Sequence, residues 1–433
     1  MSMIHLDGLE ESIRASATDL RDDQSLDPLM ERIGDARFVL LGEASHGTSE
    51  YYTWRTRISK RLIQEKGFRF IAVEGDWPDC YELNRYIKGR IDSNMTARDV
   101  VHRFDRWPTW MWANWEVVAI AEWMRKFNAS RPEVEKVGFY GLDVYSLWES
   151  LDAIYAHLRQ FHPESLKEAI QAMVCFEPFN REGQEYAWHT RFVAEDCEDE
   201  VVSLLTALRT SRPTYPDDPE AHFDAEQNAL VAVNAERYYR SMVRSDAGSW
   251  NIRDMHMAET LDRLADHYGP DAKAIVWEHN THIGDARATD MAEAGMVNVG
   301  QLARERHHLE GVVLVGFGGY EGTVVAASRW GAPMQVLTVP QGRGGSWESV
   351  LHHALGRNAL LVLDPFSESR QRGHRAIGVV YHPEREAHGN YVPTDLAQRY
   401  DAFLYLEETH AIHPLHLDER TPLEPPETYP WGE

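Results

Sequence analysis

The sequence predicts an α/β protein whose two ends build one mixed, largely parallel sheet, with a large helical insertion between them. Two apolar runs, residues 37–42 and 68–74, flank a charged helical stretch, which is the order of a parallel βαβ unit. Helical periodicity then dominates residues 78–268, and short apolar runs return beyond it. We therefore expect an N-terminal part of the core at 1–77, a mainly helical subdomain at 78–268 and a C-terminal part of the core at 269–433.

Each element follows from its own pattern. The first apolar run leads into a helix over 48–66, which ends at Gly67, and the second run predicts a buried strand. In the middle of the chain we expect helices at 114–128, 146–161, 191–210 and 224–245, a short strand at 137–142, and a proline-rich loop at 212–219. Later strands are expected at 274–277, 311–317, 360–363, 377–381 and 403–406.

The charge balance excludes several classes of protein. The 433 residues include 44 Lys+Arg and 69 Asp+Glu, which gives a net charge of −25. An acidic field disfavours binding to nucleic acid or to an anionic membrane, and 43% hydrophobic residues are too many for a disordered acidic chain. No apolar run approaches the ~20 residues that span a bilayer, and the N-terminus lacks the features of a secretory signal. We expect a soluble, cytoplasmic protein.

Cysteine usage agrees with that compartment. Cys80, Cys175 and Cys197 are odd in number, far apart and without a C-x-x-C pair. This spacing argues against a disulfide framework and against a structural zinc site.

The common chemical signatures are absent. There is no G-x-S-x-G nucleophile elbow, no Walker A lysine loop and no H-E-x-x-H. The glycine-rich run 316–322 has Glu321 where a dinucleotide fingerprint needs its third glycine. The run 342–346 has backbone amides that could hold an anion, although we favour a plain surface loop.

Titratable side chains follow three predicted strands. Glu43 and His46 follow the first strand, Glu74 ends the second, and His279 and His282 follow the strand at 274–277. Ligands of open α/β sheets bind beyond the carboxyl ends of the strands. We expect Glu74 beside Glu43 on one edge, where two carboxylates raise the basicity of a histidine and fix its tautomer. The structural alternatives are a helix cap for Glu43 and ordinary loop positions for the histidines.

Two charged residues near these segments have competing interpretations. Arg55 lies one to two turns into the following helix, where its guanidinium could pair with the carboxylates or stabilise an oxyanion. A solvated helix face is the alternative. For Asp76 we favour a cap of the helix that begins near Pro78.

Tryptophans are dense in residues 107–115. Such a run can line a large apolar pocket or dock the helical insertion on the sheet. We take Trp77, Trp107 and Trp110 as candidate substrate-binding residues. The spacing of His410, His413 and His416 suggests a metal site, but Pro414 prevents a shared helical face, so we favour a structural role.

Seven short segments, in order from about residue 30 to 416, together resemble the erythromycin esterase family. They lie at 41–50, 71–76, 141–145, 251–259, 277–282, 295–300 and 408–415. Members hydrolyse the macrolactone ester of macrolides or are homologues of unknown substrate, some with a succinoglycan-biosynthesis label. Glu278 stands where the resistance members are expected to have a small residue, so the chain is similar to the homologue branch.

The resemblance implies a hydrolase in which His46 is the general base that activates water, with no serine or cysteine nucleophile. The implied site comprises Glu43, His46, Arg55, Glu74, His279 and His282, and no cofactor.

Two alternatives stay open at this point. The first is a metallohydrolase with zinc or manganese held by Glu43, His46, Glu74, His279 and His282. The second is a non-catalytic binder of a large apolar ligand. The expected partner is a small-molecule ester, with no nucleic acid or membrane, and the sequence predicts no oligomeric state.

Overall fold

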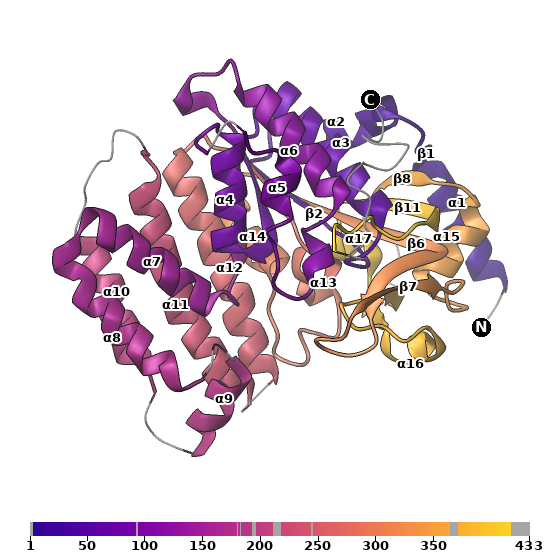
Figure 1. Cartoon of the computed structure of the whole chain (residues 1–433). Coiled ribbons are helices and arrows are strands. Elements are labelled where there is room, and N and C mark those ends of the chain that lie inside the picture. Colours follow the sequence, from indigo (N-terminus) through magenta and orange to yellow (C-terminus); the bar gives the residue numbers. More distant parts are fainter. Residues whose placement is uncertain are drawn as a thin grey trace.

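A nine-stranded sheet forms the centre of the protein (Figure 1). The computed structural model describes residues 3–91, 94–179, 181, 183–192, 196–210, 218–243, 246–363 and 371–416. The strand order is β1-β8-β11-β6-β2-β5-β3-β4, and β7 pairs with β6. The strands are β1 (Ala17–Asp19), β2 (Phe38–Leu41), β3 (Phe70–Asp76), β4 (Gly138–Asp143), β5 (Ala274–Trp277), β6 (Val312–Ala327), β7 (Met334–Val339), β8 (Ala359–Val362) and β11 (Ala402–Thr409). A separate pair consists of β9 (Arg372–Arg375) and β10 (Tyr391–Thr394).

Most of the sheet is parallel. The neighbours from β11 to β4 run parallel, while β1, β8 and β7 pair antiparallel. Alternate residues of the central strands enter two different apolar cores: Val39 and Leu41 face one side, Phe38 and Leu40 the other. Burial on both faces explains why these strands read as continuous apolar runs. The predicted mixed α/β fold is confirmed.

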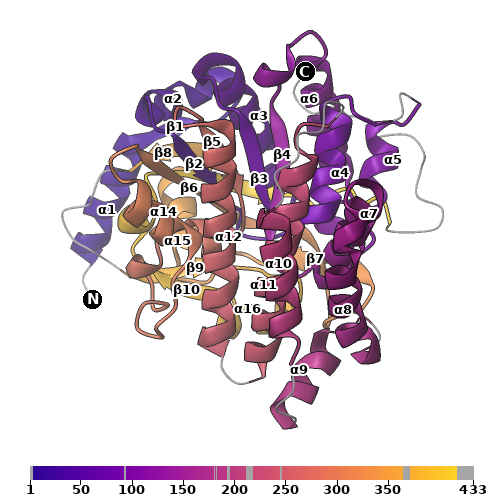
Figure 2. The same ribbon diagram turned by 90° about the vertical axis from the view of Figure 1, so that its left-hand side faces the viewer.

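Helices cover both faces of the sheet (Figures 1 and 2). The first core includes side chains of α2 (Asp27–Ile33), α3 (Ser49–Lys66), α4 (Trp77–Ile87), α5 (Ala97–Val101) and α6 (Trp115–Asn128). The second includes those of α1 (Met3–Ser16), α12 (Asp246–Tyr268), α13 (Asn280–Ile283), α14 (Val299–His307), α15 (Trp347–Leu355) and α17 (Leu396–Arg399). The short α16 (Glu386–Gly389) lies between β9 and β10 in the chain.

The remaining helices lie beside the sheet with an apolar core of their own. They are α7 (Leu147–Phe161), α8 (Leu166–Phe176), α9 (Gly183–Phe192), α10 (Glu198–Thr210) and α11 (Ala221–Met242). Figure 1 shows them together on the left, and Figure 2 shows α11 running alongside α12.

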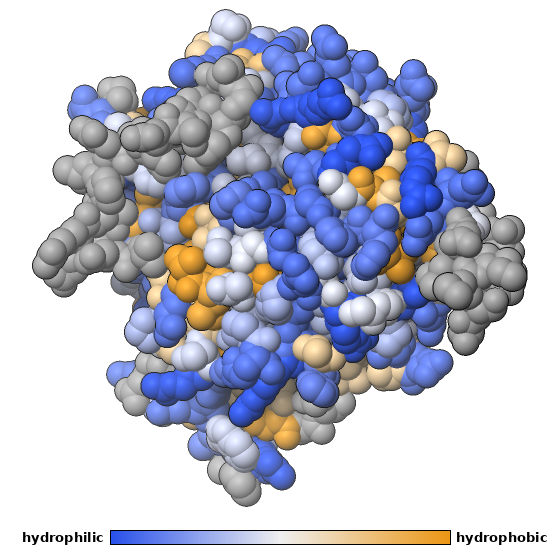
Figure 3. All heavy atoms as spheres, turned by 90° about the vertical axis from the view of Figure 1, so that its right-hand side faces the viewer, coloured by the Kyte–Doolittle hydropathy of each residue, from blue (hydrophilic) through white to orange (hydrophobic). Residues whose placement is uncertain are grey.

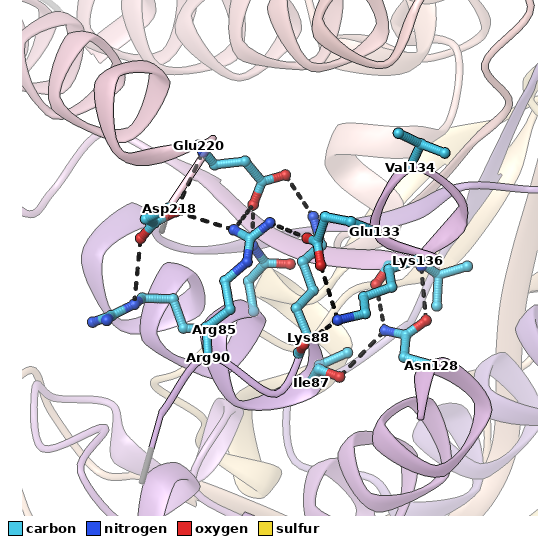
Figure 4. A network of polar contacts seen from close by, with 12 residues as sticks. Arg85, Ile87, Lys88, Arg90, Asn128, Glu133, Val134, Lys136, Asp218 and Glu220 are labelled. Atoms are coloured by element: carbon cyan, nitrogen blue, oxygen red, sulfur yellow. Dashed lines mark hydrogen bonds and ion pairs between the residues drawn. The ribbon is translucent and has the colours of Figure 1, made fainter. Parts of the chain in front are cut away.

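A buried ion cluster joins these helices to α4 (Figure 4). Glu220, at the start of α11, accepts from Lys88 Nζ at 2.5 Å and from Arg90 Nη1 at 2.8 Å. Tyr140 on β4 and Tyr268 on α12 also contact the Lys88 ammonium, each at 2.9 Å. Burial raises the pKa of Glu220, but its cationic partners, including His267, Lys88 and Arg90, outweigh burial and lower it overall.

Several sequence predictions need correction. Residues 377–381 form no strand and make isolated bridges at Ile377 and Val380, because they cross the ends of other strands. The helix expected over 191–210 is interrupted, since α9 ends at Phe192 and α10 begins at Glu198. The strand expected at 311–317 is longer, because β6 continues through the glycine-rich run to Ala327. Most of the loop predicted at 212–219 lies outside the described residues.

The cysteine prediction is also wrong. Cys175 and Cys197 form a disulfide, and Cys80 is free and buried. The pair was missed because 22 residues separate the two cysteines in sequence, whereas α8 and α10 bring them together.

The surface agrees with the charge count. Figure 3 shows a mainly hydrophilic face with small apolar patches. Within the described part of the chain, no helix has the length and apolar character needed to cross a bilayer.

Candidate active site

Four adjacent parallel strands deliver polar side chains to one edge of the sheet. Their order is β2, β5, β3, β4, and their carboxyl ends carry or precede Glu43, His279, Glu74 and Asp143. The edge was predicted, but Glu74 does not neighbour Glu43 in the sheet, because β5 lies between β2 and β3. The chain supplies β5 roughly 200 residues after β3, so the βαβ pattern alone gave no sign of it.

Glu43 links His46 to Arg55. Its Oε1 accepts from His46 Nδ1 at 2.9 Å, and its Oε2 accepts from Arg55 Nη2 at 2.7 Å. The backbone before Glu43 packs closely, because a Cβ on Gly42 would lie 2.1 Å from Asn280 Oδ1. Because position 42 is glycine, the segment after β2 can lie close to α13, and Glu43 reaches the His46 imidazole.

His46 has a raised pKa. Its side chain is 9% exposed, and burial lowers its pKa. The negative charge of Glu74 and the hydrogen bond that His46 donates to Glu43 outweigh burial, so the pKa lies above its ordinary value of 6.5. Because Nδ1 is engaged by Glu43, Nε2 is the nitrogen left for chemistry.

Arg55 is the buried cation that pairs with Glu43. Its side chain is 0% exposed and lies over the rings of Tyr52 and Trp277, 4.3 and 4.9 Å from their centroids. The predicted pairing with a carboxylate is present. The suggested contact with an oxyanion is not available, because Arg55 does not line the cavity described below.

Arg253 of α12 contacts several polar side chains of the site. The sequence did not single it out as a site residue. Its Nη2 donates to Glu74 Oε1 at 2.7 Å, and Nε and Nη2 donate to the two oxygens of Asp143 at 2.9 and 2.7 Å. Its Nη1 lies 3.0 Å from His282 Nε2. Burial raises the pKa of Glu74, but the neighbouring His282, Arg253 and His46 lower it overall. The only sequence signal was the segment at 251–259.

His282 is fixed by three neighbours. Its Nδ1 lies 2.9 Å from Asp254 Oδ1, and its ring stacks on Trp250 at a centroid distance of 4.6 Å. Arg253 Nη1 lies 3.0 Å from its Nε2, so the ring is held at both nitrogens. Asp254 was not predicted either.

His279 faces His46, with ring centroids 5.0 Å apart. Its main-chain N–H donates to Glu74 Oε2 at 2.8 Å, and its Nδ1 accepts from the main-chain N–H of Thr281 at 3.3 Å. Burial, followed by the charge of His46, holds the pKa of His279 well below 6.5. His279 is therefore neutral, with its proton on Nε2.

These groups meet at one end of a cavity of about 870 Å³. The end at the strand termini is lined by His46, Glu74, Asp143, Arg253, His279 and His282. The aromatic walls are Phe104, Trp107, Trp112, Tyr145, Trp148, Tyr238, Tyr239, Trp250 and Trp330. A cavity of this size, with an aromatic lining and a few converging polar groups, is typical of a site for a large organic ligand.

The tryptophan prediction is partly wrong. Trp107 lines the cavity, but Trp77 and Trp110 are 0% and 1% exposed and lie in the two apolar cores. Trp112 was not chosen, yet it lines the cavity and donates from Nε1 to the Glu74 carbonyl at 2.9 Å. Composition showed an aromatic cluster but not which rings face inward.

The histidines at 410, 413 and 416 connect the last described segment to the rest of the protein. His410 pairs with Glu50 and His413 with Glu116, each at 2.7 Å, and the His416 ring packs on His102. Asp76 is the N-cap residue of α4, as favoured, but its side chain binds Arg106 at 2.6 Å instead of capping the helix.

The donor set does not fit a metal ion. Glu43 and Glu74 use both of their oxygens on arginine, histidine or main-chain donors. Over the described ranges, no three His, Cys, Asp or Glu side chains form a group that could hold a metal. The reaction proposed below therefore involves no metal ion.

Glu278 is an unpaired carboxyl behind the site. It is 0% exposed, and neither oxygen has a hydrogen-bond partner among the described residues. Burial, with the charges of Glu74 and Asp254, raises its pKa well above 4.5. Its protonated form is therefore favoured over a wider pH range than that of an exposed glutamate.

We expect Glu278→Gln to stabilise the protein increasingly as pH rises. The folded state holds the Glu278 proton to higher pH than the unfolded chain, which loses it above about pH 4.3. The contribution of this group to the stability of the wild type therefore falls as pH rises toward its folded pKa. Urea unfolding at pH 4 and pH 8 measures the difference, and exposed Glu293→Gln is the control. A gain that is the same at both pH values contradicts a raised pKa of Glu278.

Comparisons with known proteins identify the family of the chain. A model of the erythromycin esterase family matches residues 63–409. The chain is 22% identical to the putative hydrolase YbfO of Bacillus subtilis (strain 168), over 86% of this chain and 83% of that protein. It is also 22% identical to erythromycin esterase type II of Escherichia coli, over 59% of this chain and 62% of that protein.

Solved structures share the fold. A succinoglycan biosynthesis protein superposes with a TM-score of 0.77 at 23% identity, covering 95% of this chain and 100% of that one. An erythromycin esterase mutant in its open conformation superposes with a TM-score of 0.68 at 18% identity, covering 93% and 99%. Because the family model spans most of the sequence, the chain belongs to the erythromycin esterase family.

Proposed function

We propose that this hydrolase cleaves a macrolactone or another carboxylic ester, with His46 as the general base that activates water. The observation that carries the proposal is the His46 imidazole, held by Glu43 at Nδ1, at the edge of a large aromatic cavity. A histidine in this arrangement has one basic nitrogen, Nε2, for a water proton.

The reaction balances without a covalent enzyme intermediate. Water oxygen attacks the ester carbonyl carbon while its proton moves to His46 Nε2. The tetrahedral intermediate then collapses, the bond to the alcohol oxygen breaks, and His46 returns the proton to that oxygen. Glu74, near His46, stabilises the imidazolium that exists between the two steps.

Two neighbouring groups suit the developing oxyanion. His279 carries its proton on Nε2, and the Arg253 guanidinium lines the same end of the cavity. Preorganised donors at such a position contribute about 10²–10³-fold each in acyl-transfer enzymes. In this proposal Arg55, Glu43 and Asp254 act only by holding the other side chains in place.

The size of the cavity supports a bulky substrate. A volume of about 870 Å³ is near the upper end for sites that bind drug-sized molecules. One relative is named for erythromycin hydrolysis, which makes macrolides the first esters to test.

The direct test is to measure acid release from erythromycin and from a set of synthetic esters. A pH-stat titration records the release, with and without prior treatment of the protein with a chelator. We expect turnover that chelation leaves unchanged, and one ¹⁸O atom from labelled water in the product acid. If no ester is cleaved but a macrolide still raises the melting temperature, the protein is a binder and the proposal fails.

The pH dependence of kcat/KM follows from the raised pKa of His46. Only the neutral imidazole accepts a proton, so we expect activity to rise with pH and to reach half its maximum above pH 6.5. Glu43→Gln removes a carboxylate that raises this pKa, and should move the midpoint to lower pH. A midpoint that Glu43→Gln leaves in place contradicts the coupling of these two residues.

A further inference from the structure

Trp330 is an exposed aromatic side chain on the rim of the catalytic cavity. It lies in the turn of the β6–β7 hairpin, visible in Figure 1, and is 61% exposed. Nine large hydrophobic residues of the described chain are exposed, and Trp330 is the one among them that lines the cavity. Single exposed apolar residues are ordinary on protein surfaces, so its position needs further support.

The Trp330 ring is held in place by its neighbours. It packs against Trp107, with ring centroids 4.5 Å apart, and Trp107 Nε1 donates to the Ala332 carbonyl at 3.0 Å. The hairpin reverses at Gly331, whose φ of +72° favours glycine. The indole is thus fixed before any ligand arrives, which reduces the entropy lost on binding.

Other aromatic side chains line the same cavity. They include Tyr145 and Trp148, near the start of α7, and Tyr239 of α11. The catalytic groups lie in the strand-end segments and α12, while Trp330 belongs to the β6–β7 hairpin. A ligand that reaches both must be large, because a short ester bound at His46 has no group to extend to the rim.

We infer that Trp330 is a specificity-determining residue that binds the apolar part of a bulky ester and selects it over short esters. This rests on the proposed function and names the class of substrate. Burial of one face of an indole against an apolar group at roughly 25 cal/mol per Å² corresponds to about a tenfold preference.

The test compares p-nitrophenyl acetate with p-nitrophenyl esters of bulky polycyclic acids. For Trp330→Ala we expect the ratio of kcat/KM for the bulky ester to that for acetate to fall about tenfold, mainly through KM. Trp330→Phe should restore most of the ratio. Trp188→Ala is the matched control, since Trp188 is 52% exposed and does not line the cavity, and it should leave the ratio unchanged.

Binding of the neutral dye Nile red separates this inference from the proposed function. We expect Trp330→Ala, but not Trp188→Ala, to weaken dye binding. If wild type cleaves no ester but the dye still depends on Trp330, the proposed function fails and the rim contact stands. The inference is overturned if esters are cleaved and Trp330→Ala changes neither the ratio of kcat/KM values nor the dye affinity. It is also overturned if Trp330→Ala lowers kcat/KM for both esters by the same factor.

Discussion

His46→Ala is expected to lower kcat on a cleaved ester by about 10²–10⁴-fold, the usual contribution of general base catalysis. The substituted side chain loses the nitrogen that accepts the water proton, while the cavity and the oxyanion donors stay in place. KM should change much less, because His46 contributes little of the cavity surface. Initial rates at saturating ester, at a pH above the His46 midpoint, give the comparison.

The control for this prediction is His308→Ala. His308 is exposed, lies outside the cavity and makes one long contact to a main-chain carbonyl at 3.4 Å. Its replacement should leave kcat unchanged. Near-wild-type turnover by His46→Ala would falsify the proposed base, provided that both variants melt at the wild-type temperature.

Arg253→Ala is expected to reduce the free energy of unfolding by about 3–5 kcal/mol, as is typical when one partner of a buried ion cluster is removed. Glu74 and Asp143 are 4% and 6% exposed and would lose the cation they share. Chemical denaturation monitored by two probes measures the loss. Arg253→Lys should recover only part of it, because an ammonium cannot reproduce the fork of donors to Asp143.

A surface pair gives the matched control for Arg253. Arg306 donates to Asp262 at 2.6 Å, with side chains 36% and 33% exposed. Exposed pairs contribute about 0–1 kcal/mol, so Arg306→Ala should have a small effect. If the two arginine variants are equally stable, the cluster around Arg253 does not hold the strand ends together.

The sequence predicted the edge of the sheet but not the order of its strands. Apolar runs and the polar residues after them are local features, so Glu43, His46 and Glu74 could be found from their positions. The insertion of β5 between β2 and β3 is a long-range event that no local pattern records. The two glutamates therefore lie one strand further apart than expected, with His279 between them along the edge.

Residues in long helices were the hardest to assign. Arg253 and Asp254 lie within the 23 residues of α12, where the helical pattern gives no reason to single them out. The same holds for Trp77 and Trp110, since an indole that faces the core and one that faces a cavity look alike in sequence. Only the tertiary packing decides which face of a helix meets the ligand.

The place of β5 between β2 and β3 also affects how the chain is made. At about 5–20 residues per second, the ribosome needs roughly 10–40 s to reach β5 after β3 has emerged. During that time β2, which is apolar on both faces, has neither of its sheet neighbours, and β3 has only β4. The nascent chain thus carries exposed strand edges that favour aggregation, and the sheet closes only when most of the protein has been synthesised.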